Sequence, residues 1–147
     1  MTDKTAFTDD EWKVVAEGPT TAGMILITAD RGGSFRETWA LSKTLAEARQ
    51  HHGASELLDA IVSEKPGFDR GGAQTGEEVK SLGLERLRQA VGLLEQKASA
   101  QEVDDYRTFV VNVATKVAQA HKEHGQEVSQ PEQAALDEIS SALRSTD

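Results

Sequence analysis

The chain of 147 residues contains no cysteine. It therefore cannot form a disulfide, a thiolate metal site or a cysteine nucleophile, and it suits a reducing cytosol. Aromatic residues make up only 5% of the chain, and proline occurs three times. Residue types that favour strands are sparse outside helical patterns, whereas Ala, Leu, Glu, Gln, Lys and Arg dominate. This composition predicts an all-α protein.

The chain also lacks an excess of positive charge and any long apolar run. With 16 Lys and Arg against 25 Asp and Glu, its net charge is −9, which opposes binding to nucleic acid or to anionic lipid. The most hydrophobic run, Met24 to Ala29, is far too short to span a bilayer. The first residues, MTDKTAFTDDEW, have no apolar core of a secretion signal. We therefore expect a cytoplasmic protein that binds neither nucleic acid nor membrane.

Enzymatic signatures are missing as well. The sequence has no P-loop, no GxGxxG or GxSxG motif and no HExxH. Asp30 and Glu37 are the one carboxylate pair that we consider as a candidate functional site. Asp30 follows the most hydrophobic segment and would be partly desolvated near Arg31 or Arg36. The ordinary interpretation of this pair is a turn residue and a capping glutamate. No catalytic residue and no cofactor are predicted.

Five capping boxes, each a Ser or Thr followed three residues later by Glu, precede apolar helical patterns. They begin at Thr8, Ser34, Thr75, Ser99 and Ser129. In such a box the hydroxyl accepts a hydrogen bond from the backbone N–H three residues on, and the glutamate returns one. Together the boxes predict a single-domain bundle of six or seven helices over residues 1–147, with residues 1–6 flexible and residues 65–76 forming a long loop.

The stretch from Ser99 to Gly125 carries the clearest apolar stripe, and we expect it to be the core helix. The stripe comprises Val103, Tyr106, Val110, Val113, Val117 and Ala120, widened by Phe109 and Ala114. A helix from Thr20 to Ala29 contains four large apolar residues in succession, so the rest of the fold should wrap it; a buried strand is the alternative.

The remaining helices follow from the same periodicity. They are expected from Asp9 to about Glu17, Ser34 to His51, Ser55 to Glu64, Thr75 to about Lys97, and from Ser129 onward. Gly83 and Gly92 interrupt the helix that ends near Lys97 and mark either a break near Gly83 or close backbone packing. Asp-Arg-Gly-Gly occurs at residues 30–33 and 69–72, which reflects either a duplicated helix-loop-helix or the common recurrence of glycine-rich turns.

The histidines are the candidates for metal chemistry. His121 and His124 lie three residues apart near the end of the core helix, and His51 lies four residues after Glu47. Two helix ends could thus present imidazoles and a carboxylate. Their spacing matches no established ligand motif, and cationic side chains gather at helix C-termini for electrostatic reasons. No metal site is favoured on this basis.

A family of small, uncharacterised bacterial all-helical proteins shows a similar order of features. The matching features are Phe7-Thr8 through Glu11-Trp12, Gly18-Pro19, the apolar run ending at Ala29-Asp30, and Ser129-x-x-Glu132 before Leu136. The pattern is also distantly similar to the TerB-like helical domains of tellurite resistance. This resemblance implies a helical fold and a bacterial origin, without an activity. The acidic clusters associated with metal binding in TerB-like domains have no matching positions in this chain.

The sequence therefore predicts a helical binding or interaction module rather than an enzyme. The alternative is a metal-binding, TerB-like stress-response protein that uses acidic and histidine side chains, and metal analysis of untagged protein distinguishes the two. Apolar faces such as Trp39-Leu41-Leu45 and Leu136-Ile139-Leu143 suggest more apolar surface than a small core hides. The expected partner is another protein or a second copy in a two-fold dimer, with the C-terminal helix as its interface.

Overall fold

The computed structural model describes residues 4–29, 41–47, 56–63, 75–119 and 130–144. Within these ranges the chain forms helices and no strand, so the all-α prediction is confirmed. The helices are η1 (Lys4–Ala6), α1 (Asp9–Ala16), α2 (Gly18–Ala29), α4 (Glu56–Ser63), α5 (Gly76–Lys97), α6 (Ala100–Gln119) and α7 (Gln130–Leu143). Residues 41–47 form a further helical segment. No helix in these ranges combines the length and hydropathy needed to cross a bilayer.

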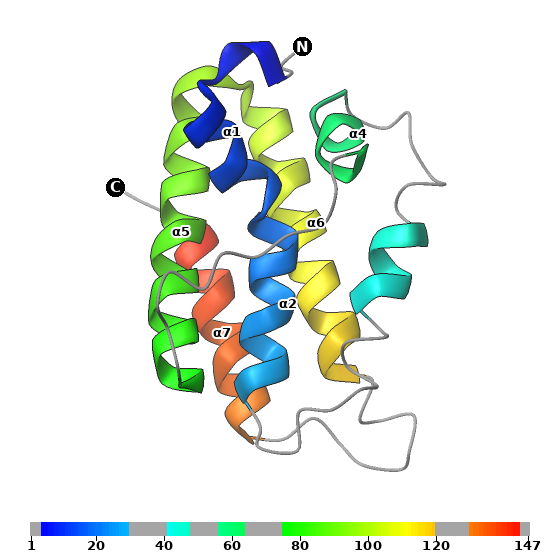
Figure 1. Ribbon diagram of the computed structural model, residues 1–147, viewed down its shortest axis with the longest axis vertical. Helices are drawn as coiled ribbons and strands as arrows, with labels where there is room; N and C mark the ends of the chain where they lie inside the picture. Colours follow the sequence, from blue (N-terminus) through cyan, green and yellow to red (C-terminus); the bar gives the residue numbers. More distant parts are fainter. Residues whose placement is uncertain (1–3, 30–40, 48–55, 64–74, 120–129, 145–147) are drawn as a thin grey trace.

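Four long helices run side by side along the long axis of the molecule (Figure 1). In this view α2 and α6 run downward, and α5 and α7 run upward. Helix α2 packs mainly on α5 and α6, and α7 lies against α5 and α6 and also contacts α2. Helix α1 packs on α5, and α4 contacts both α1 and α6. The core therefore lies between α2, α5, α6 and α7.

The start of α1 has the predicted capping box. The Thr8 backbone N–H donates to Glu11 Oε1 at 2.9 Å, and the Glu11 N–H donates to Thr8 Oγ1 at 3.2 Å. The rings of Phe7 and Trp12 lie 5.7 Å apart, as a hydrophobic staple requires. Lys97, at the end of α5, donates to the Ala6 carbonyl and to Glu11 Oε1, each at 2.9 Å. These contacts tie η1 and the start of α1 to the end of α5.

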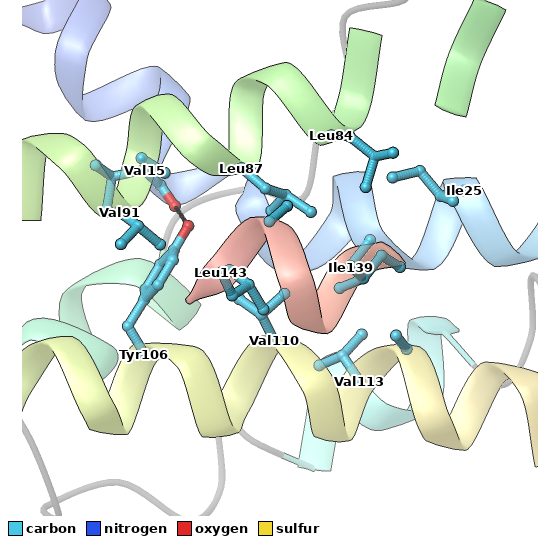
Figure 2. Close-up of a cluster of buried hydrophobic side chains, with 14 of the residues drawn as sticks. Val15, Ile25, Leu84, Leu87, Val91, Tyr106, Val110, Val113, Ile139 and Leu143 are labelled. Atoms are coloured by element: carbon cyan, nitrogen blue, oxygen red, sulfur yellow. Dashed lines mark hydrogen bonds between the residues drawn. The ribbon is translucent and has the colours of Figure 1, made fainter. Parts of the chain in front are cut away.

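The α1–α2 junction is tighter than expected. The second helix begins at Gly18, two residues before Thr20, with Pro19 in its first turn, so that only Glu17 separates α1 from α2. At this junction the buried Tyr106 hydroxyl of α6 donates to the Val15 carbonyl at 2.7 Å (Figure 2). A Cβ on Gly18 would lie 1.9 Å from the Tyr106 hydroxyl oxygen. The junction therefore requires glycine at this position.

Helix α2 is wrapped by the other helices, as its sequence predicts. None of its residues from Gly18 to Thr28 is exposed, and Ile25 and Leu26 are fully buried. Two glycines bring neighbours unusually close to it. A Cβ on Gly23 would lie 2.5 Å from the side chain of Leu41, and a Cβ on Gly83 of α5 would lie 2.7 Å from that of Ile25. Helix α5 is continuous through Gly83, so this glycine marks close packing and not a break.

The predicted stripe on α6 is buried in the core. Its buried members are Val103, Tyr106, Val110, Val113, Ala114 and Val117, joined by Ala118. Ser99 and Glu102 form the predicted capping box, with reciprocal hydrogen bonds of 3.0 and 3.1 Å. From α7, Ile139 and Leu143 enter the same core and are 0% and 1% exposed (Figure 2). Most of the apolar face suggested for a dimer is therefore covered within the chain.

Several predicted features lie partly or wholly outside the described residues. The capping hydroxyls Ser34 and Ser129 and both Asp-Arg-Gly-Gly segments fall in the gaps, as do residues 65–74 of the expected long loop. Of residues 1–6, the described part forms η1. At the end of the expected loop, Thr75 caps α5 by accepting from the Glu78 N–H at 3.1 Å, and Gly76 is already helical.

Candidate binding groove

An open groove of about 300 Å³ lies between α6 and α7. It is lined by Arg107, Thr108, Val111, Asn112, Ser140, Leu143 and Arg144. All of these residues belong to α6 or α7, apart from Arg144, which directly follows α7. The volume lies at the lower end of the range for ligand pockets.

The groove has an apolar floor and polar walls. Half-buried Val111 and buried Leu143 are its apolar members. Thr108 and Asn112, one turn apart on α6, are exposed, and half-buried Ser140 faces them from α7. The lining part of α6 spans about 8 Å, at about 1.5 Å per residue. A stretch of this length is in contact with only a short part of a ligand.

Arg107 closes one end of the groove and fixes the two helices to each other. Its Nε donates to the Leu143 carbonyl at the end of α7. Its two terminal nitrogens contact Asp104 at 3.3 Å and Glu95 of α5 at 3.4 Å. The side chain is 26% exposed. Because two carboxylates balance its charge and a carbonyl occupies its Nε, Arg107 has a positioning role here.

Arg144 also lines the groove and directly follows Leu143, whose carbonyl accepts from Arg107, but its contacts differ from those of Arg107. Its side chain is exposed. Among the described residues none forms an ion pair or hydrogen bond with its guanidinium. A cation after the last turn of a helix is favoured by the helix dipole, which accounts for its position. No contact within the described residues engages the hydrogen-bond donors of its guanidinium, and these donors suit a ligand.

Within the described ranges two groups have clearly shifted pKa values, and neither of them lines the groove. Burial raises the pKa of Tyr106 well above its usual value. The backbone N–H of Thr8 and then the ammonium of Lys97 lower the pKa of Glu11. Burial accounts for the first shift, and the cap of α1 together with Lys97 accounts for the second, so neither shift indicates an acid or base of a catalytic site.

The structure does not assemble the site residues considered from the sequence. Asp30, Glu37, His51, His121 and His124 lie outside the described residues, and Glu47 is exposed at the end of the 41–47 helix. In the ranges that the structure describes, no three His, Asp or Glu side chains are grouped as metal ligands would be. The metal-binding alternative and the watched carboxylate pair therefore stay predictions.

The groove is not predicted from the sequence, although the spacing of its polar residues is visible there. Thr108 and Asn112 are four residues apart, as are Ser140 and Arg144, and each pair flanks an apolar residue. On isolated helices such pairs look like ordinary solvated faces. Only the packing of α6 on α7 brings them to one site. Leu143 was expected on an apolar face left for a partner, whereas the structure buries it in the core at 1% exposure, beside the groove.

Comparison with known proteins gives no significant match to a family model, to a curated sequence or to a solved structure. The resemblance to TerB-like domains accordingly stays a prediction, and the groove itself is the basis for a functional proposal.

Proposed function

We propose that this protein is an interaction module that holds a short segment of another protein in the α6–α7 groove. The observation that carries this proposal is the combination of an open apolar floor and the available guanidinium of Arg144 at one end. Sites that bind proteins commonly combine an apolar centre with a polar rim and are enriched in Arg. The absence of cysteine from the chain supports action in the cytoplasm, where disulfides are rare.

A protein segment fits the groove better than a buried small molecule does. The groove is open, and Thr108, Asn112 and Ser140 offer hydroxyl and amide groups along its walls. Such groups can bond to the N–H and C=O groups that every peptide carries. Half-buried Val111 is the apolar surface that takes one side chain of the segment, because Leu143 is only 1% exposed.

A second copy of this chain is a less suitable occupant. The dimer face suggested by the sequence consists of Leu136, Ile139 and Leu143, and the last two are core residues that are 0% and 1% exposed. Only Leu136 remains half-buried at the surface. A stable interface buries about 800 Å² on each partner, and two of the three residues of this face are already covered within the chain.

Nuclear magnetic resonance titration of the isotope-labelled protein tests the proposal. The probes are three capped dipeptides, acetyl-Leu-Glu-amide, acetyl-Leu-Gln-amide and acetyl-Leu-Lys-amide. We expect at least one of them to shift the resonances of Thr108, Val111 and Ser140, with millimolar affinity because the contact is small. Shifts that concentrate elsewhere, or no shifts with any probe, would contradict the proposal.

Sedimentation at micromolar concentration identifies the kind of partner. We expect a monomer. A dimer that dissociates in the Arg144→Glu variant would make a second copy the occupant of the groove, and the proposal of a different protein partner would then be wrong.

A further inference from the structure

We propose that the segment bound in the α6–α7 groove is acidic, with an Asp or Glu carboxylate on Arg144 next to an apolar side chain on Val111. This inference rests on the proposed function, because it names the class of segment that the same groove accepts. Three features of the groove lead to this inference. They are its charge, the order of its residues along the helices, and the different contacts of its two arginines.

The charge of the lining is positive. Two arginines line the groove, and none of its seven lining residues carries a carboxylate. The charge of Arg107 is balanced by Asp104 and Glu95, which lie outside the lining. Arg144 is left with its full charge, since no ion pair engages it among the residues the structure describes. A carboxylate in the groove meets this charge directly, whereas a lysine ammonium is repelled by it.

The order of residues places the charge at one end and the apolar floor beside it. Because Arg107 bonds to the Leu143 carbonyl, the positions near 107 on α6 lie beside the end of α7. Helices α6 and α7 run in opposite directions (Figure 1), so Val111 lies on the side of Ser140. The groove thus runs from Arg144 across Leu143 to Val111. A ligand with a carboxylate and a neighbouring aliphatic side chain matches this order.

Arg107 holds the end of α7, which Arg144 directly follows, and its own donors are already engaged. With Nε on the Leu143 carbonyl and its terminal nitrogens on two carboxylates, Arg107 holds the end of α7 in place. The guanidinium of Arg144, one residue further on, offers a planar pair of donors that suits a carboxylate. The carboxylate therefore binds Arg144, and Arg107 is a positioning residue.

The net charge of −9 works against an acidic ligand at long range. At about 0.15 M ionic strength, interactions over more than about 8 Å are largely screened. The contact with Arg144 then dominates over the repulsion by distant carboxylates. The experiment on selectivity for acidic segments should therefore be done at about 0.15 M ionic strength.

The three capped dipeptides measure the selectivity through the shifts of the Val111 methyl groups. We expect acetyl-Leu-Glu-amide to bind about threefold more tightly than the Gln peptide, which is the size typical of an exposed ion pair. The Lys peptide should bind most weakly. Arg144→Gln should remove the difference between the Glu and Gln peptides, and Arg144→Glu should make the Lys peptide the tightest of the three. Lys116→Gln, an exposed site outside the lining, is the matched control and should keep the wild-type order.

The outcomes separate this inference from the function on which it rests. Equal affinity for the Glu and Gln peptides, or a preference that survives in Arg144→Gln, would overturn the acidic ligand while the groove still binds peptides. If none of the three peptides shifts the groove resonances, the proposed function fails together with the inference.

Discussion

The hydroxyl of Tyr106 donates to the carbonyl of Val15 at 2.7 Å, across 91 residues of sequence. Tyr106 is fully buried on α6, and Val15 lies in the last turn of α1. The carbonyls in the last turn of a helix lack intrahelical partners. The tyrosine supplies a donor there, and Gly18 leaves the space in which it fits.

A double-mutant cycle tests this relationship. Tyr106→Phe should lower the free energy of unfolding by about 1 kcal/mol, the net value of a buried hydrogen bond. Gly18→Ala should cost about 2–3 kcal/mol through overpacking, because its Cβ meets the tyrosine hydroxyl. In the Tyr106→Phe background the cost of Gly18→Ala should be smaller, which denaturant unfolding of the four proteins measures. Strictly additive effects would mean that the two residues do not interact.

Gly83 and Gly92 both lie on α5 but differ in the space around them. A Cβ on Gly83 would lie 2.7 Å from Ile25 and 3.0 Å from Thr21, whereas nothing lies within 4 Å of a Cβ on Gly92. Gly92→Ala should therefore stabilise the protein by about 0.4–1 kcal/mol. Gly83→Ala should destabilise it, since the clash exceeds the gain in helix propensity. Thermal unfolding of both variants checks the signs, and equal effects would contradict the packing of α2 on α5.

Much of the fold was predictable from local patterns, because capping boxes and apolar periodicity act within one helix. Thr8, Thr75 and Ser99 accept the predicted hydrogen bonds, and the stripe from Val103 to Val117 is buried. The sequence alone allows Gly83 to mark either a helix break or close packing. It cannot decide between them, because close packing depends on Ile25, which is far away in the sequence. The groove was not predicted for the same reason, since its walls come from two helices.

Glu11 should make stability depend on pH in the acidic range. Its pKa in the folded protein is lowered, first by the Thr8 backbone N–H and then by Lys97. Its stabilising effect is therefore complete above the usual glutamate pKa of 4.5 and is lost as the pH falls through the lower pKa of the folded protein. Thermal unfolding of wild type and Glu11→Gln should differ at pH 7, with the wild type more stable, and the difference should shrink below pH 4.5. A difference that grows on acidification would refute this assignment.

Val110 tests the core. It is 0% exposed in the middle of the α6 stripe (Figure 2). Val110→Asp should destabilise the domain by about 3–5 kcal/mol, because it buries a carboxylate without a partner. Asn112→Asp, two residues on at an exposed site, is the control and should stay within about 0.5 kcal/mol of wild type. Wild-type unfolding of the Val110→Asp variant would show that the stripe is not buried.

Blocking the groove tests the central claim most directly. Ser140 lines the groove, whereas its neighbour Ser141 is exposed and outside the lining. The measurement is the titration of the Val111 and Leu143 methyl resonances with acetyl-Leu-Glu-amide in wild type, Ser140→Trp and Ser141→Trp. A binding groove predicts saturable shifts in wild type and Ser141→Trp that are lost in Ser140→Trp, whose indole fills the space. Resonances that do not move in wild type, or that move equally in all three proteins, would contradict the account.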